Sequence, residues 1–199
     1  MSENEKITRA AGVVGLATLL SRVLGLVRDL VIAYFFGASL AADAFFVAFR
    51  IPNLLRRLLA EGALTVSFIP IFTEYLTTRS RAEAFELARA VLTLLSMILA
   101  VISVLGVLLA PWIIWAFAPG FSADPDKFAL TVLLTRIMFP YIFLIALVAL
   151  AMGVLNSLGK FAGPALAPVM LNVGMIASVL LLSRYFDPPI LALAIGVIF

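Results

Sequence analysis

The chain has 199 residues, of which 64% are hydrophobic and 13% are charged. Soluble domains average about 45–50% apolar and about 25% charged residues, so this composition indicates a membrane protein. A net charge of +3 without a concentrated basic face argues against the nucleic-acid-binding class. The absence of cysteine and histidine excludes disulfides, thiol nucleophiles, Cys/His zinc sites and histidine general bases. We expect no metal site and no catalytic residue.

Long apolar segments follow one another along the chain, and about six of them reach the length of about 20 residues that a membrane-spanning helix needs. We therefore expect an all-α polytopic membrane protein in which residues 1–199 form one transmembrane lobe. The expected helices are 11–36, 41–75 with a bend at Pro52, 88–117, 129–155, 164–182 and 189–199. The last segment is still apolar where the sequence stops. We interpret it as a truncated helix and the chain as a fragment of a longer protein.

Basic residues are unevenly distributed between the two sets of connections. The first ten residues are charged and have no obvious small-residue cleavage site, which is typical of a cytoplasmic tail and not of a removed signal peptide. One set of connections carries Lys6, Arg9, Arg79, Arg81, Arg89 and Lys160, and the other carries Asp124, Asp126, Lys127, Arg184 and Asp187. The positive-inside rule then predicts a cytoplasmic N-terminus.

Prolines and glycines recur inside the apolar segments. The prolines are Pro52, Pro70, Pro140 and Pro168, and the glycines are Gly12, Gly15, Gly25, Gly163 and Gly174. The prolines indicate either a bundle of bent helices around a cavity or the ordinary abundance of proline in membrane helices. For the glycines, close helix packing is favoured over a hinge.

Eight charged residues, besides Glu74 at the end of the second segment, lie within the first two apolar segments. They are Arg22, Arg28 and Asp29 in the first, and Asp43, Arg50, Arg56, Arg57 and Glu61 in the second. One charge at the centre of a membrane helix costs about 2.5–3.5 kcal/mol to insert, so these groups must face protein, a water-filled cavity or one another. Arg50, Arg57 and Glu61 follow spacings of seven and four and form one helical stripe, in which the last two can pair.

Two interpretations of these charges stay open. Arginines near helix ends can snorkel to the headgroups and form internal salt bridges. Alternatively, five arginines against three acids leave a positive surface that fits an anionic ligand, since the planar guanidinium binds phosphate oxygens in pairs. Arg136 stands apart in the fourth segment, where interfacial snorkelling or an ion pair is expected.

Several stretches resemble the MurJ/MviN family. Residues 21–29, SRVLGLVRD, and residues 42–63, ADAFFVAFRIPNLLRRLLAEGA, resemble its first and second helices. The shorter stretches APW at 110–112, APGF at 118–121, FPY at 139–141 and PALAP at 164–168 occur in matching order. The members of this family are flippases for lipid II, the undecaprenyl-pyrophosphate-linked precursor of peptidoglycan. They act in the bacterial inner membrane in cell-wall synthesis and the maintenance of cell shape.

The resemblance implies a fold and a site. The family has fourteen transmembrane helices in two lobes, within the MOP exporter superfamily, so this chain corresponds to the first lobe and lacks the C-terminal lobe. Alternating access around a cationic cavity is implied. The family's important positions match Ser21, Arg22, Arg28, Asp29, Asp43, Arg56 and Glu61, and the charge pattern adds Arg50 and Arg57. The serine and the arginines are expected to bind substrate, and the carboxylates to line the cavity.

No cofactor is expected, although sodium or the membrane potential is a candidate for coupling. The family's sodium site belongs to the second lobe. Three alternatives stay open: a superfamily transporter with another cargo, such as an O-antigen-type lipid or a drug, a membrane enzyme acting on a polyprenyl phosphate, or a scaffold that transports nothing. Such an enzyme uses carboxylates with magnesium on loops, whereas the clustered carboxylates here lie inside apolar segments.

Overall fold

A computed structural model of the chain describes residues 3–58 and 66–198, and the side chains from residue 11 onward. These residues form helices and connections, with no strand among them. The helices are α1 (Glu3–Phe36), α2 (Leu40–Arg56), α3 (Ile69–Thr78), α4 (Arg81–Phe117), α5 (Pro125–Met138), α6 (Tyr141–Ser157), α7 (Ala162–Leu182) and α8 (Ile190–Gly196). Two short 3₁₀ helices, η2 (Pro119–Ala123) and η3 (Ser183–Tyr185), lie between them.

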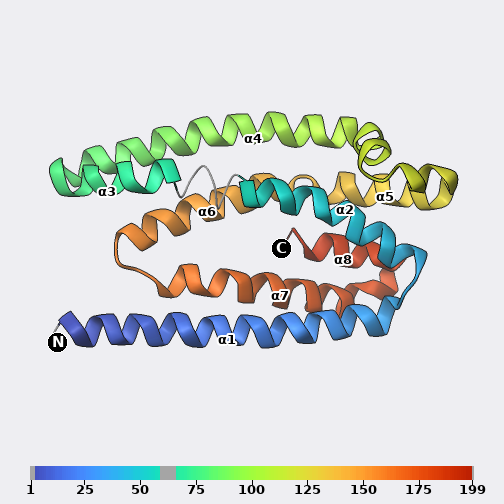
Figure 1. Cartoon of the computed structure of the whole chain (residues 1–199), viewed down its shortest axis with the longest axis horizontal. Helices are drawn as coiled ribbons and strands as arrows, with labels where there is room; N and C mark the ends of the chain where they lie inside the picture. The colour runs from blue at the N-terminus through green and yellow to red at the C-terminus, as the bar shows by residue number, and fades with distance from the viewer. Residues whose placement is uncertain (1–2, 59–65, 199) are drawn as a thin grey trace.

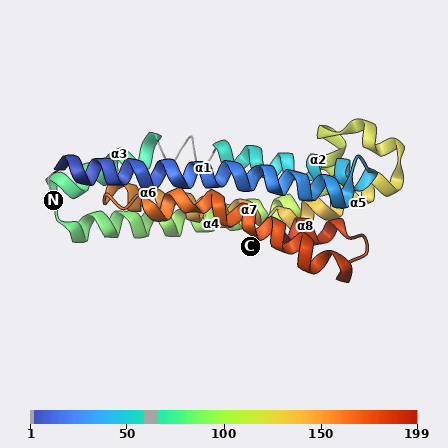
Figure 2. The same ribbon diagram turned by 90° about the horizontal axis from the view of Figure 1, so that it is seen from below.

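The long helices run along one common axis (Figure 1). In that view α1 and α7 lie side by side along one edge, α4 forms the opposite edge with α3 beside it, and the other helices lie between. The bundle is elongated and thinner in the third direction (Figure 2). The N-terminus, the α3–α4 connection and the α6–α7 connection lie at one end, and the α1–α2 and α4–α5 connections lie at the other (Figure 1).

Three stretches of the described chain are long and apolar enough to cross a bilayer. They are Arg81–Phe117 with 37 residues, Pro125–Ser157 with 33 and Ala162–Tyr185 with 24. Their outward faces carry exposed apolar side chains such as Leu108 and Leu181. Soluble monomers rarely expose large contiguous apolar patches, whereas lipid tails cover such faces at no cost. The chain is therefore a multi-pass membrane protein.

The buried side chains form three clusters between the helices. The first joins α2, α5, α7 and α8 around Phe45, Met138 and Leu193. The second joins α2, α4, α5 and α6 and includes Leu99 and Ile142. The third, at the end nearest the N-terminus, joins α3, α4 and α6. Ile32 of α1 also belongs to the first cluster, so buried apolar contacts join every helix of the bundle to its neighbours.

Polar residues at the helix ends follow the expected chemistry. The Ser39 and Ser80 hydroxyls accept hydrogen bonds from the first-turn N–H groups of α2 and α4. Asp124 caps α5 by accepting from two backbone N–H groups, and Pro125 occupies the first turn, where its missing N–H costs nothing. Gly37 has a φ of 55°, a left-handed conformation that glycine adopts readily, and it closes the α1–α2 turn.

Some helix bounds differ from the sequence-based expectation. The segment expected at 41–75 contains α2 and α3, with residues 59–65 outside the described chain. The segment expected at 129–155 starts earlier, at Pro125, and divides into α5 and α6 at Phe139–Pro140. Pro140 has no N–H to donate to the carbonyl four residues before, so the helix breaks there. Pro52 and Pro168 instead stay inside α2 and α7.

Of the glycines predicted to pack closely, Gly25 and Gly163 lie where an added Cβ would be in ordinary contact with Asn172 and Leu155. At Gly12 and Gly15 an added Cβ would meet no atom within 4 Å. At Gly106 of α4, by contrast, it would collide with the ring of Phe139, which is buried against that glycine. The absence of a side chain at Gly106 lets the α5–α6 junction approach the α4 backbone.

We predict that Gly106→Ala lowers the free energy of unfolding by about 1–3 kcal/mol, because the methyl group overpacks the Phe139 ring. Equilibrium unfolding of the full-length protein in mixed detergent micelles measures the change. Gly12→Ala is the matched control, since its methyl group enters open space. Equal stability of the two variants would contradict the packing described here.

Candidate functional site

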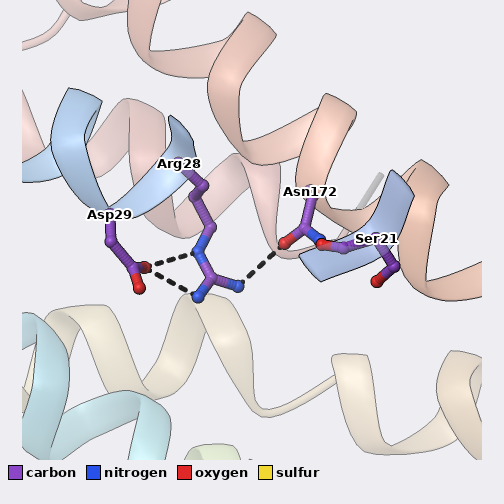
Figure 3. Close-up of polar contacts among 4 residues, drawn as sticks. All are labelled: Ser21, Arg28, Asp29 and Asn172. Carbon is purple, nitrogen blue, oxygen red and sulfur yellow. Dashed lines mark hydrogen bonds and ion pairs between the residues drawn. The ribbon is translucent and has the colours of Figure 1, made fainter. Parts of the chain in front are cut away.

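Arg28 on α1 is the centre of a polar cluster between α1 and α7 (Figure 3). Its Nε and Nη2 donate to Asp29 Oδ1 at 3.0 and 2.7 Å, and its Nη1 donates to Asn172 Oδ1 on α7 at 2.9 Å. The arginine side chain is 28% exposed and the aspartate side chain 64%. Two predicted site residues that are neighbours in the sequence thus form an ion pair, and Asn172 from a distant helix binds the arginine of that pair.

Asn172 joins the two helices through both ends of its amide. Its Nδ2 donates to the backbone carbonyl of Ser21 at 3.0 Å while its Oδ1 accepts from Arg28 (Figure 3). Only this amide orientation satisfies both partners, because a guanidinium only donates and a carbonyl only accepts. Asn172 is 5% exposed, so α1 and α7 meet at a buried polar bridge.

The sequence analysis did not single out Asn172. A signal was present, because an asparagine inside an apolar membrane segment tends to hydrogen-bond to a neighbouring helix. Its partner is 144 residues away in the sequence, and nothing in the sequence pattern identifies α1 as that partner.

The Arg28 guanidinium retains capacity for a ligand. It has five N–H donors, and the three hydrogen bonds above use one on each nitrogen. Within the described chain, one N–H therefore remains on Nη1 and one on Nη2. Two such N–H groups fit two oxygens of a carboxylate or phosphate. Asp29 and Asn172 fix the orientation in which this pair is presented.

Asp43, in the first turn of α2, forms a second polar cluster. Lys127 Nζ on α5 lies 2.9 Å from Asp43 Oδ2 and 4.1 Å from the centroid of the Phe121 ring. The ion pair and the cation–π contact tie the start of α2 to η2 and α5. Lys127 was not predicted as a site residue. It lies in one of the connections that also carry acidic residues.

The remaining predicted arginines lie on two helices. Arg22 on α1, Arg50 on α2 and Arg57, which follows the last residue of α2, are exposed. Arg56 is partly buried and donates from Nε to Asn53 Oδ1 at 3.0 Å. The two helices diverge from their shared turn, with α7 and α8 between them (Figure 1). Glu61 lies outside the described residues. A common cavity lined by all these charges stays a prediction.

Metal binding finds no support among the described side chains. They contain no group of three or more potential acidic ligands close enough to hold an ion. The polar clusters pair carboxylates with cations instead of with one another. In both clusters a carboxylate contacts the cation directly, at 2.7 Å for Arg28 and 2.9 Å for Lys127.

A family model described as lipid II flippase MurJ matches residues 32–199. The matched region contains α2 with its arginines and the last five residues of α1. It covers well over half of the chain.

Curated relatives from several bacteria align with nearly the whole chain. A protein named lipid II flippase MurJ from Burkholderia cenocepacia is 50% identical over 181 residues, which are 91% of this chain and 35% of the relative. Proteins named probable lipid II flippase MurJ from Haemophilus influenzae and Treponema pallidum are 43% and 41% identical, over 90% and 100% of this chain and 37% and 38% of the relatives. The chain thus spans little more than a third of their length.

A solved structure has the same fold over most of the chain. It is titled lipid II flippase MurJ, inward closed conformation, and superposes with a TM-score of 0.76 at 32% identity. The match covers 93% of this chain and 39% of the solved chain.

We predict that Asn172→Leu lowers the free energy of unfolding by about 1–3 kcal/mol, because it removes two buried hydrogen bonds and leaves a guanidinium donor unpaired. Unfolding of the full-length protein in mixed micelles measures the loss. Val173→Leu changes an exposed apolar position next to it and is expected to be neutral. If both variants are as stable as the parent protein, the bridge does not hold α1 to α7.

Proposed function

The chain belongs to the MurJ family, and from this premise we propose that it is one lobe of a lipid II flippase. The observation that carries the proposal is Arg28, which lies in an apolar helix, is oriented by Asp29 and Asn172, and keeps two N–H groups for an anion. A diphosphate linked to a lipid is an anion that enters a membrane cavity, and the surplus of arginine on α1 and α2 suits it. Peptidoglycan synthesis and cell shape would depend on this transport.

The proposed mechanism is alternating access. Arg28, Arg22 and Arg56 capture the diphosphate of the lipid-linked head group, with Ser21, Arg50 and Arg57 adding to the binding surface. Asp29, Asp43 and Glu61 orient the cations or bind sugar and peptide groups. The lipid tail stays in the bilayer. A second lobe, absent from this chain, moves against this one, and the two states bind the head group with different affinity, as any such cycle requires.

The proposed orientation has the N-terminus in the cytoplasm of a bacterial inner membrane. Arg79, Arg81 and Lys160 belong to the connections at the same end of the bundle as the N-terminus (Figure 1). The positive-inside rule supports a cytoplasmic location for that end. Lipid II is made on that side, so substrate entry there fits the proposal.

The coupling energy is proposed to come from the membrane potential or from sodium. Moving one charge across 100 mV supplies about 2.3 kcal/mol. The ion site is assigned to the part of the protein that this chain lacks. A superfamily transporter with another lipid or a drug as cargo is the second candidate, and the intramembrane arginines favour an anionic cargo over a neutral one.

We predict that full-length protein restores exposure of lipid II at the outer face of cells depleted of their own flippase. Arg28→Ala is expected to lower the initial rate of exposure roughly tenfold or more, because hydrogen bonds to a charged group contribute about 1.5–3 kcal/mol. Lipid II accessibility to an external modifying enzyme reports the rate.

Arg184→Ala is the control for loss of an arginine, since Arg184 stacks on Tyr185 in η3, outside both polar clusters. Membrane levels of each variant are measured in parallel. Full activity of Arg28→Ala at normal abundance would remove the anion-binding role. If purified protein forms a magnesium-dependent product from a polyprenyl phosphate, the protein is an enzyme and not a transporter.

A further inference from the structure

The α4 helix has a backbone carbonyl that the helix itself cannot satisfy. In an α-helix each N–H donates to the carbonyl four residues before it, but Pro111 has no N–H, so the Val107 carbonyl loses that donor. Arg136 on α5 replaces it, because its Nε donates to the Val107 carbonyl at 3.3 Å. Among the described residues the partner of Arg136 is this neutral carbonyl and not an acid, so the expected ion pair is not seen there, and snorkelling stays a prediction.

The Arg136 charge is left without a counter-ion in the described part of the chain. Its side chain is exposed, and only its Nε donates to α4, at the Val107 carbonyl. The N–H groups of both terminal nitrogens are therefore still available to bind an anion. Because a cation at the edge of hydrocarbon is costly unless paired, an anion from the surroundings is needed.

Two tryptophans mark the membrane depth of this arginine. Trp112 and Trp115 are 66% and 64% exposed on α4. They follow Val107 by five and eight residues, which is about 8 and 12 Å along the helix axis. Exposed tryptophans concentrate at the headgroup level, so the Arg136 guanidinium, held beside Val107, lies about 8–12 Å below that level. Local thinning of the bilayer around an arginine brings lipid phosphates down to such a depth.

An apolar pocket adjoins the same carbonyl. Ser103, Val104, Val107, Leu108 and Pro140 line an open groove of about 210 Å³ between α4 and the α5–α6 junction. The Ser103 hydroxyl has no hydrogen-bond partner among the described residues, but it is buried and does not reach the pocket surface. The surface of the pocket is therefore hydrocarbon. An apolar cavity of about 150 Å³ holds a benzene molecule, so this pocket has room for a short stretch of acyl chain.

We propose that this face of α4 and α5 is a binding site for an anionic phospholipid of the bilayer. The terminal nitrogens of Arg136 bind the lipid phosphate, and the pocket takes part of an acyl chain. Val107 connects the two halves of the site, since its carbonyl anchors the arginine and its side chain lines the pocket. The site is separate from the polar clusters on α1 and α2 and does not depend on the transport proposal.

Lipid titration followed by native mass spectrometry tests the site. Full-length protein is delipidated and titrated with phosphatidylglycerol or with phosphatidylcholine of the same acyl chains. At one site the protein is expected to bind the anionic lipid about fivefold more tightly, the value of one interfacial arginine. Arg136→Gln is expected to abolish this preference, whereas Arg184→Gln, the matched control, is expected to keep it.

The pocket is tested separately, by a variant that leaves Arg136 and its carbonyl partner intact. Val104→Phe is expected to fill the pocket and weaken binding of both lipids about fourfold, the value of one buried methylene. Val101→Phe is the control, because Val101 is as exposed as Val104 on the same helix, at 59%, but does not line the pocket.

Three outcomes would overturn the proposal. The first is an unchanged lipid preference in Arg136→Gln. The second is equal binding by the two phenylalanine variants. The third is displacement of the lipid by millimolar sn-glycerol 3-phosphate, which would make the site one for free phosphate. If Arg136→Gln fails to fold, the phenylalanine pair and the glycerol phosphate competition still decide the matter.

Discussion

The constraint on which this structure depends is that hydrocarbon offers no hydrogen bonds, so the protein must satisfy its own polar groups. Backbone groups satisfy this requirement within the helices. The hydroxyls of threonines such as Thr131 and Thr135 of α5 donate hydrogen bonds to the carbonyl four residues before. Where proline removes a donor, the helix continues at some positions and ends at another. Pro111 stays helical with Arg136 on the opened carbonyl, whereas the chain breaks at Pro140.

The same constraint governs the charges. Arg28 reaches Asp29 and Asn172, and Lys127 reaches Asp43, so each of these cations meets an acid and a second group, an amide or a ring. Pairing lowers the cost of placing charge near lipid without removing the donors that a phosphate needs. Positions that stabilise the lobe and positions suited to substrate are therefore partly the same residues, and a substitution at Arg28 affects both.

Much of the architecture was predictable from sequence, because a span of about 20 apolar residues and a cluster of charges are both local signals. The helical character of the chain and the neighbouring charges Arg28 and Asp29 were identified in this way, whereas Ser21 came from the family resemblance and takes part through its backbone carbonyl. Tertiary contacts were not predictable. Nothing local distinguishes Pro140, which ends a helix, from Pro52 or Pro168, which do not. Among the described glycines, Gly106 packs closely against Phe139 and Gly196 against Ser178, contacts that no local pattern marks.

The bridge between α1 and α7 also has a consequence for biosynthesis. Asn172 follows Arg28 by 144 residues, so the ribosome makes the first helix long before its partner. At roughly 5–20 residues per second, α1 waits about 7–30 s with Arg28 and Ser21 lacking their α7 contact. During that interval the translocon or an insertase must shelter α1. A slower elongation rate lengthens this period, and degradation competes with assembly throughout it.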